Sequence, residues 1–403
     1  MKHTDNIVFF SGTTNIRAGG PAGYIANLQK SLSETNCDNI VFITSNNTKF
    51  IAVKIIKFIS STISCICPIQ SIRRRIRNTL IKILGFGATL DDIRTKTFYK
   101  HLLRYNPKTI TCHYTPDALS IREFLTKYNL DAKLILMSHS PQPPSEEIYE
   151  NALSKNDPTA LDQLKHWQRL ERSAFEAADI YLFPSPEALT CYTDKMEYLP
   201  NLIKQKQIVY MRTGCAELQT TKTTAQLRDE YNIKTPYVIC YIGRHNTIKG
   251  YDKLKQIAAM VLQQRNDVTF LIGGALGPIE PLKHDRWLEL GRCNPAEALK
   301  ASDLFILPNK QTYFDLILLE VLSSGTPCIA SKTGGNITVY QDTGAIQLYE
   351  TITECADKIN SFLDSGADTK TQMADMSRNA YLTHYTLQHF ATNYINLIKE
   401  IIQ

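Results

Sequence analysis

The sequence predicts an α/β protein in which two doubly wound, Rossmann-like domains face each other across a cleft. Short apolar runs alternate with stretches of helical periodicity, a pattern typical of parallel sheets that helices cover on both faces. This alternation starts again after residues 211–214. With 403 residues, the chain is also long enough for two domains of ordinary size.

The first predicted domain covers residues 1–213. It is expected to begin with a strand at 7–10, a glycine-rich loop at 11–23 and a helix at 24–32. Further strands are predicted at 39–44, 109–112, 134–137 and 180–183, and a further helix at about 159–178.

The second predicted domain covers residues 214–386 and repeats the alternation. Strands are predicted at 238–242, 269–272, 304–307 and 328–331. Helices are predicted at about 252–264, 295–300 and 314–323, and a last amphipathic helix at about 387–402.

Composition favours a soluble globular protein, with 43% hydrophobic and 21% charged residues. The apolar run at 7–10 is too short for the core of a signal peptide, so a cytoplasmic location is expected. The ten cysteines lack the paired spacing of a zinc site and are interpreted as reduced packing residues. No metal site is therefore predicted.

A basic segment at residues 49–82 contrasts with the mixed charge elsewhere. No acidic residue lies between Asp38 and Asp91, whereas eight basic ones do. They are Lys49, Lys54, Lys57, Arg73, Arg74, Arg75, Arg77 and Lys82. This pattern, with apolar residues at helical spacing over 72–83, favours peripheral binding to an anionic membrane surface. An ordinary surface helix is the alternative, and nucleic acid is not expected as a partner because no aromatic platform accompanies the cations.

Two cations, Arg244 and Lys249, follow the predicted strand that ends at Ile242. A departing nucleoside diphosphate develops negative charge, which an enzyme without a metal must stabilise with fixed cations and backbone N–H groups. Each of the two would equally suit an exposed turn. They indicate a diphosphate site only in combination with the later segment that contains Glu320 and Gly325-Thr326-Pro327.

Glu320 is a solitary acid in an apolar helix, and a carboxylate can accept hydrogen bonds from two sugar hydroxyls at once. Its alternative role is as a partner of the helix dipole. The backbone N–H groups of Phe314, Asp315 and Leu316 would lie at the start of this helix, where a phosphate or sugar is readily bound.

The order and spacing of Gly243-Arg244, Lys249-Gly250, Glu320 and Gly325-Thr326-Pro327 resemble the C-terminal half of retaining GT-B glycosyltransferases of family 4. The resemblance implies the GT-B fold and transfer from a nucleoside diphosphate sugar with retention, without a metal or other cofactor. It also implies that the last helix crosses back onto the first domain.

Roles for individual residues also follow from this resemblance. Arg244 and Lys249 would contact the diphosphate, and Glu320 would bind the ribose hydroxyls. Two positions depart from the family pattern: Thr312 replaces a Glu that contacts the transferred sugar, and Asp315 replaces a Gly. The expected donor is therefore a sugar other than the glucose or mannose type, or a sugar held mainly through Asp315 and backbone groups.

In the first domain, Gly19 and Gly20 belong to a loop that lines the cleft in the family, although a plain strand-to-helix turn would look the same. His139 and His113 each follow a predicted strand, and either could be purely structural. His139 matches a family histidine that faces the reacting sugar and is preferred over His113. A zinc site formed by both is disfavoured, because no further ligand lies at a suitable spacing.

The resemblance implies a cytoplasmic, membrane-peripheral enzyme that extends a lipid-linked bacterial glycan, such as a capsule or O-antigen. Two other enzymes have the same cleft: a phosphorylase, which would need a lysine for pyridoxal phosphate, and a sugar-nucleotide epimerase. A GT-B-like binding protein without catalysis is the third alternative, because Thr312 departs from the family motif.

Overall fold

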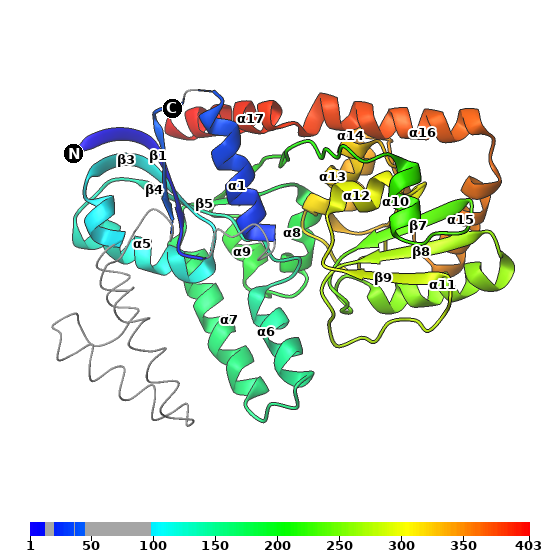
Figure 1. Ribbon diagram of the computed structural model, residues 1–403. Coiled ribbons are helices and arrows are strands. Elements are labelled where there is room, and N and C mark those ends of the chain that lie inside the picture. Colours follow the sequence, from blue (N-terminus) through cyan, green and yellow to red (C-terminus); the bar gives the residue numbers. More distant parts are fainter. Residues whose placement is uncertain (13–19, 36, 45–97) are drawn as a thin grey trace, which may run out of the picture.

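The computed structural model describes residues 1–12, 20–35, 37–44 and 98–403. Gly19 and the basic segment at 49–82 lie outside this part of the chain, so the expectations for them stay predictions. Within the described residues, two parallel six-stranded sheets alternate with helices in the two-domain arrangement shown in Figure 1. The predicted α/β fold class is confirmed.

The first sheet has the strand order β2-β1-β3-β4-β5-β6. Its strands are β1 (Lys2–Phe10), β2 (Ile40–Thr44), β3 (Tyr105–Cys112), β4 (Lys133–Leu136), β5 (Ile180–Phe183) and β6 (Gln207–Tyr210). Ile7 and Val8 in β1 are fully buried, as expected of a strand covered on both faces. The strand order reverses at β1, and ligands of open α/β sheets bind near such switch points.

The helices of this domain are α1 (Gly20–Ser33), α5 (Thr115–Lys127), α6 (Pro144–Leu153), α7 (Ala160–Ala177), α8 (Pro186–Thr193) and α9 (Leu199–Ile203). Helix α1 begins four residues before the predicted start, because Gly20 and Pro21 form its first turn, where proline's fixed φ suits a helix. Helices α6 and α7 lie side by side and extend away from the sheet in Figure 1.

The second sheet has the order β12-β11-β10-β7-β8-β9. Its strands are β7 (Tyr237–Ile242), β8 (Val268–Gly273), β9 (Trp287–Gly291), β10 (Leu304–Leu307), β11 (Cys328–Ser331) and β12 (Gln347–Tyr349). Its helices are α10 (Thr224–Glu230), α11 (Tyr251–Gln264), α12 (Pro295–Lys300), α13 (Leu316–Ser324), α14 (Gly334–Thr343), α15 (Ile352–Asp364) and α16 (Ala367–Ala380). Helix α13 begins two residues later than predicted, which places Asp315 at its N-cap.

A π-helical turn at Tyr381–Tyr385 connects α16 to the last helix, α17 (Leu387–Ile402). Helix α17 packs on α1, β1 and β3. The Tyr394 hydroxyl donates to Asn6 Oδ1 at 2.9 Å, and Lys133 Nζ donates to the carbonyl of Ile401 at 2.7 Å. The C-terminal helix thus lies on the first domain.

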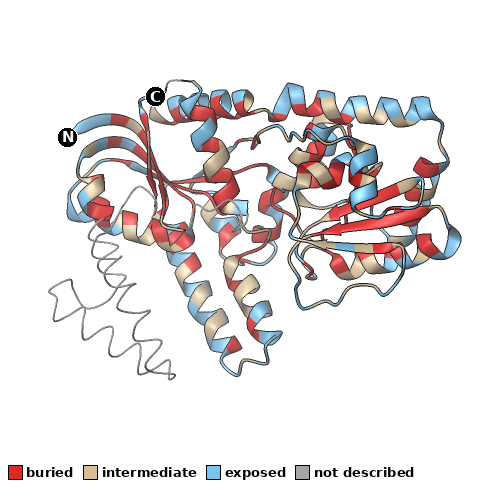
Figure 2. Ribbon diagram, viewed as in Figure 1, coloured by how far each residue is buried: buried red, intermediate tan, exposed pale blue. Residues whose placement is uncertain are grey.

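Polar contacts between α8 and α14 join the two domains. The Thr338 hydroxyl lies 2.7 Å from Ser185 Oγ and 2.8 Å from Glu187 Oε2. Arg212 pairs with Asp342, with Nε 2.6 Å from Oδ2. One cluster of buried apolar residues extends through both domains and a second lies within the second domain, and Figure 2 shows buried residues on the strands and inner helix faces.

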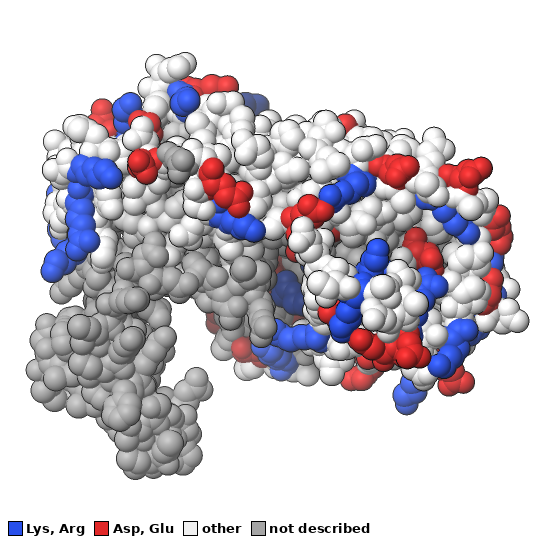
Figure 3. Space-filling view, turned by 45° about the horizontal axis from the view of Figure 1, so that its top comes forward, with Lys and Arg blue, Asp and Glu red and all other residues white. Residues whose placement is uncertain are grey.

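On the surface in Figure 3, acidic and basic side chains are interspersed over the second domain, so neither sign dominates that face. None of the helices in the described part of the chain is both long and apolar enough to cross a bilayer.

Candidate active site

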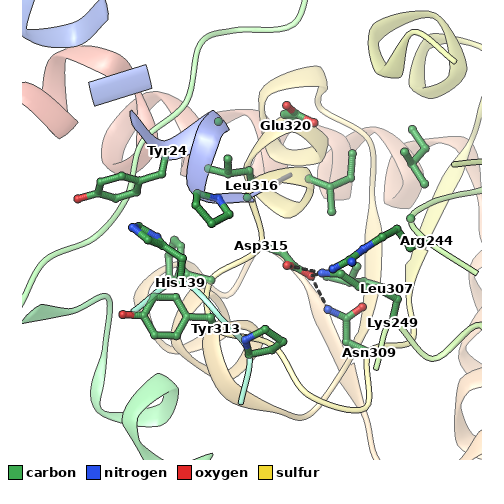
Figure 4. A pocket seen from close by; sticks show the side chains of 18 of the residues that line it. Tyr24, His139, Arg244, Lys249, Leu307, Asn309, Tyr313, Asp315, Leu316 and Glu320 are labelled. Atoms are coloured by element: carbon green, nitrogen blue, oxygen red, sulfur yellow. Dashed lines mark hydrogen bonds and ion pairs between the residues drawn. The ribbon is translucent and has the colours of Figure 1, made fainter. Parts of the chain in front are cut away.

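A cavity of about 730 Å³ lies between the two domains (Figure 4). Its size falls within the range of small-molecule binding sites. The wall combines the start of α1 and the loop after β4 with the loops after β7 and β10 and the start of α13. It includes these predicted site residues: Gly20, His139, Arg244, Lys249, Phe314, Asp315, Leu316 and Glu320.

Thr312 is placed differently. Its side chain is buried and is not part of this cavity's lining, and its hydroxyl has no hydrogen-bond partner within the described part of the chain. Its contact with a sugar stays a prediction.

Lys249 forms a close ion pair with Asp315. Its Nζ lies 2.6 Å from Oδ1 and 2.8 Å from Oδ2, and Asn309 donates to the same carboxylate (Figure 4). Although Asp315 is the N-cap residue of α13, its side chain does not cap the helix and contacts Lys249 instead. The positive charge predicted to bind the diphosphate is therefore partly neutralised by a neighbour.

Arg244 is the more available cation, with a side chain that is 62% exposed. It lies 3.8 Å from Glu147 Oε1 of α6, a weak contact that crosses the cleft. Arg292, in the loop after β9, also lines the cavity and is exposed. Arg292 was not predicted as a site residue, because the short strand before it has no clear apolar pattern.

Gly250 fixes the turn that carries Lys249. Its φ is +66°, and a Cβ at this position would collide with the backbone carbonyl of Pro308. The backbone of the turn therefore packs directly on the loop after β10. The glycine of this motif is required by conformation as well as by space.

We expect Gly250→Ala to destabilise the protein by at least about 2 kcal/mol, from left-handed backbone strain plus the collision. Gly344→Ala is the matched control, because Gly344 has φ +63° with open space around its Cα. It should lose only about 1 kcal/mol. Urea unfolding measures both, and equal losses would show that the contact with Pro308 contributes nothing.

Glu320 of α13 lines the cavity at a distance from the ion pair (Figure 4), and its carboxylate has no hydrogen-bond partner among the described residues. Burial raises the pKa of Glu320 to about 7. A partly buried carboxylate of this kind is costly unless a ligand satisfies it. Its geometry suits acceptance of hydrogen bonds from ligand hydroxyls.

His139 and His113 form a hydrogen-bonded pair, with His139 Nε2 2.9 Å from His113 Nδ1. His139 lines the cavity, whereas His113 is 2% exposed and lies behind it. Burial lowers the pKa of His139 to about 3 and that of His113 well below its usual value, so both rings are neutral at physiological pH. His139 was preferred over His113 from the sequence, and the hydrogen bond between them was not predicted.

A second cavity of about 270 Å³ adjoins the first on the side of the first domain. The two share Pro21, His139, Ser140 and Glu147 as walls. The remainder of the second cavity is largely apolar and includes Trp167 of α7. No group of three potential metal-binding side chains occurs in either cavity or elsewhere among the described residues.

Comparison with known proteins places the second domain in a defined family. Residues 236–365 match the family described as glycosyl transferases group 1. The chain is 26% identical over 191 residues to N-acetyl-alpha-D-glucosaminyl L-malate synthase of Bacillus anthracis, covering 44% of this chain and 49% of that one. It is 22% identical over 277 residues to alpha-D-kanosaminyltransferase of Streptomyces kanamyceticus, which covers 63% of this chain and 70% of that one. The first match thus spans about half of the relative's length.

Solved structures extend the likeness of fold to the whole chain. Sucrose-phosphate synthase from Thermosynechococcus elongatus has a TM-score of 0.64 at 15% identity, over 98% of both chains. The Anabaena protein HepE in complex with UDP also has a TM-score of 0.64, at 14% identity, over 99% of this chain and 100% of that one. The second domain thus matches the group 1 glycosyltransferases, and the whole chain shares the two-domain GT-B fold of these solved structures.

Proposed function

We propose that this protein transfers a sugar, with retention of anomeric configuration, from a nucleoside diphosphate sugar to a glycan acceptor. The observation that carries the proposal is the convergence of Arg244, Lys249 and Glu320 on one cavity between the domains. The fold relative HepE was crystallised with UDP and with UDP-glucose, which supports a nucleotide sugar as donor.

In the proposed complex the diphosphate lies between Arg244 and the start of α13. The N–H groups of Leu316 and Ile317 occupy the first turn of that helix, where backbone donors lack intrahelical partners, and both residues line the cavity. Glu320, one turn further along, would accept hydrogen bonds from the ribose hydroxyls.

Retention is proposed to proceed by attack from the face of the leaving group. The bond from C1 to the phosphate oxygen breaks, the acceptor oxygen bonds to C1, and the leaving phosphate takes the acceptor proton. This route needs no protein nucleophile. This is consistent with the cavity, because the carboxylate of Asp315 is bound by Lys249 and Asn309 and is not free to act as a nucleophile.

Hydrolysis of the donor tests the reaction without knowledge of the acceptor. Purified protein is incubated with UDP-glucose, UDP-N-acetylglucosamine and other nucleotide sugars, and proton NMR follows the anomer first released. An α-donor should give the α-sugar. Initial release of the β-sugar would contradict retention.

The second cavity is proposed to hold the acceptor. Its volume of about 270 Å³ suits a single ring, and Trp167 supplies an aromatic wall next to His139. The chain has two tryptophans, and the other, Trp287, is buried in the second domain. Fluorescence of a Trp287→Phe variant therefore reports on Trp167 alone.

We expect octyl glycosides to change the fluorescence of Trp287→Phe, and Trp167→Ala to weaken their use as acceptors about tenfold, a loss typical of one aromatic contact. The KM for the donor should not change. An unchanged KM for the acceptor would place the acceptor elsewhere.

The natural acceptor is proposed to be a lipid-linked bacterial surface glycan, reached from a membrane surface through residues 49–82. Changing Arg73, Arg74, Arg75 and Arg77 to Gln should remove about 4 kcal/mol of attraction to anionic vesicles, at about 1 kcal/mol for each charge. Sedimentation with anionic vesicles measures this, and neutral vesicles are the control. Binding that survives both these changes and added salt would refute a basic membrane contact.

A catalytically inactive sugar-nucleotide binding protein is the second candidate. The ion pair between Lys249 and Asp315 favours it, because it reduces the charge available to a leaving group. Donor hydrolysis by the wild-type protein separates the two candidates.

A further inference from the structure

We propose that His113 is a positioning residue that holds His139 in the tautomer with hydrogen on Nδ1, so that His139 offers the cavity a hydrogen-bond donor. The inference deepens the proposed function, since the oxygen that would accept this bond belongs to the sugar donor or its acceptor. It begins with the contact of 2.9 Å between His139 Nε2 and His113 Nδ1.

Two neutral imidazoles joined in this way share one hydrogen, which leaves two possible arrangements. In the first, His113 donates from Nδ1, its own Nε2 is bare, and His139 carries its hydrogen on Nδ1. In the second, His139 donates from Nε2, its Nδ1 is bare, and His113 carries a hydrogen on Nε2.

The surroundings of His113 distinguish the two arrangements. His113 Nε2 is buried and has no hydrogen-bond partner among the residues that the structure describes. The second arrangement would leave a buried N–H there without an acceptor, whereas the first leaves only a bare lone pair. Orphaned buried N–H groups are the rarer of the two kinds of defect, and an unmade bond of this type costs about 1–3 kcal/mol. The first arrangement is therefore favoured.

The remaining hydrogen then lies where a ligand can use it. His139 is only half-buried, and its Nδ1 is not among the buried atoms that lack a partner. The ring lies near those of Tyr24 and Tyr313, with centroids 4.7 Å and 6.2 Å away, which restricts its rotation (Figure 4). His139 consequently donates to an oxygen in the cavity and does not take the proton of the acceptor at Nδ1.

Nitrogen NMR of the full-length protein labelled with ¹⁵N-histidine tests the tautomer directly, because protonated and bare imidazole nitrogens have well separated shifts. His139→Leu assigns the signals. The result expected for wild type is a protonated Nδ1 and a bare Nε2 in His139. A protonated Nε2 in His139 would overturn the proposal.

His113→Leu tests whether His113 imposes this state. In this variant, His139 should shift towards the mixed tautomers of an unrestrained imidazole, while a folded NMR spectrum shows that the domain is intact. If His139 keeps Nδ1–H as its single tautomer without His113, the positioning role is refuted. Because the tautomer is read without substrate, absence of donor hydrolysis would count against the proposed reaction and leave this inference standing.

Discussion

Lys249→Ala is expected to lower turnover of the nucleotide sugar about a hundredfold or more, because loss of one group that stabilises a developing charge costs about 3 kcal/mol. The substitution removes a cation and also leaves the carboxylate of Asp315 facing the diphosphate. Both effects act against the leaving group. Initial rates of donor hydrolysis measure the loss.

The ion pair allows these two effects to be separated by a double-mutant cycle. Asp315→Asn alone should tighten binding of UDP, because Lys249 becomes free to contact the diphosphate. If Lys249 served only to neutralise Asp315, the double variant would recover wild-type turnover, and that outcome would remove Lys249 from the phosphate site. Lys332→Ala is the control, since Lys332 also pairs with an acid, Glu350, but on the surface.

Glu320→Gln is expected to weaken UDP binding about tenfold or more, since hydrogen bonds to charged groups contribute about 1.5–3 kcal/mol. In the wild type, affinity should rise as the pH passes through about 7, where the carboxyl group ionises. The variant should show a smaller rise, because only ionisation of the terminal phosphate of UDP, with a pKa of about 6, then remains. Calorimetric titration at pH 6 and pH 8 measures it, and unchanged affinity at pH 8 would exclude Glu320 from the nucleotide site.

The same variant should be more stable than wild type at high pH. Because the pKa of Glu320 is raised on folding, its contribution to stability is fully present below its unfolded pKa and is lost as the pH rises through about 7. Burial also raises the pKa of Asp117 and Glu171 to about 7, so these groups contribute to the pH dependence of stability in the same range. The contribution of Glu320 is therefore read from the difference in Tm between variant and wild type. A higher Tm with weaker UDP binding at pH 8 would mark a residue kept for function.

The sequence predicted the strands that form the centre of each sheet. Strands such as β5 and β10 are short, continuous apolar runs, and their burial on both faces makes them visible in the pattern. Strands β6, β9 and β12 were missed. They lie at sheet edges, where β6 and β9 are mostly half-buried or exposed and β12 has three residues. The edge strand β2 was predicted because its residues 40–43 form a continuous apolar run.

The site was predicted as a set of residues but not as a set of contacts. The pair of histidines depends on β3 and β4 being neighbours in the sheet, a fact that strand positions along the chain do not contain. The pairing of Lys249 with Asp315 likewise joins residues 66 positions apart. For Thr312, the resemblance to the family implies a sugar contact, and burial of this residue could not be predicted from its spacing to Glu320.

The position of α17 determines the order in which the molecule can be completed during synthesis. Domains generally fold as they emerge from the ribosome, N-terminal first. Here Asn6 and Lys133 must wait for Tyr394 and Ile401, which are made after the whole second domain. The first domain is therefore translated before the second but completed after it, and a nascent chain that stalls before residue 387 would expose an apolar surface over α1 to the cell's chaperones.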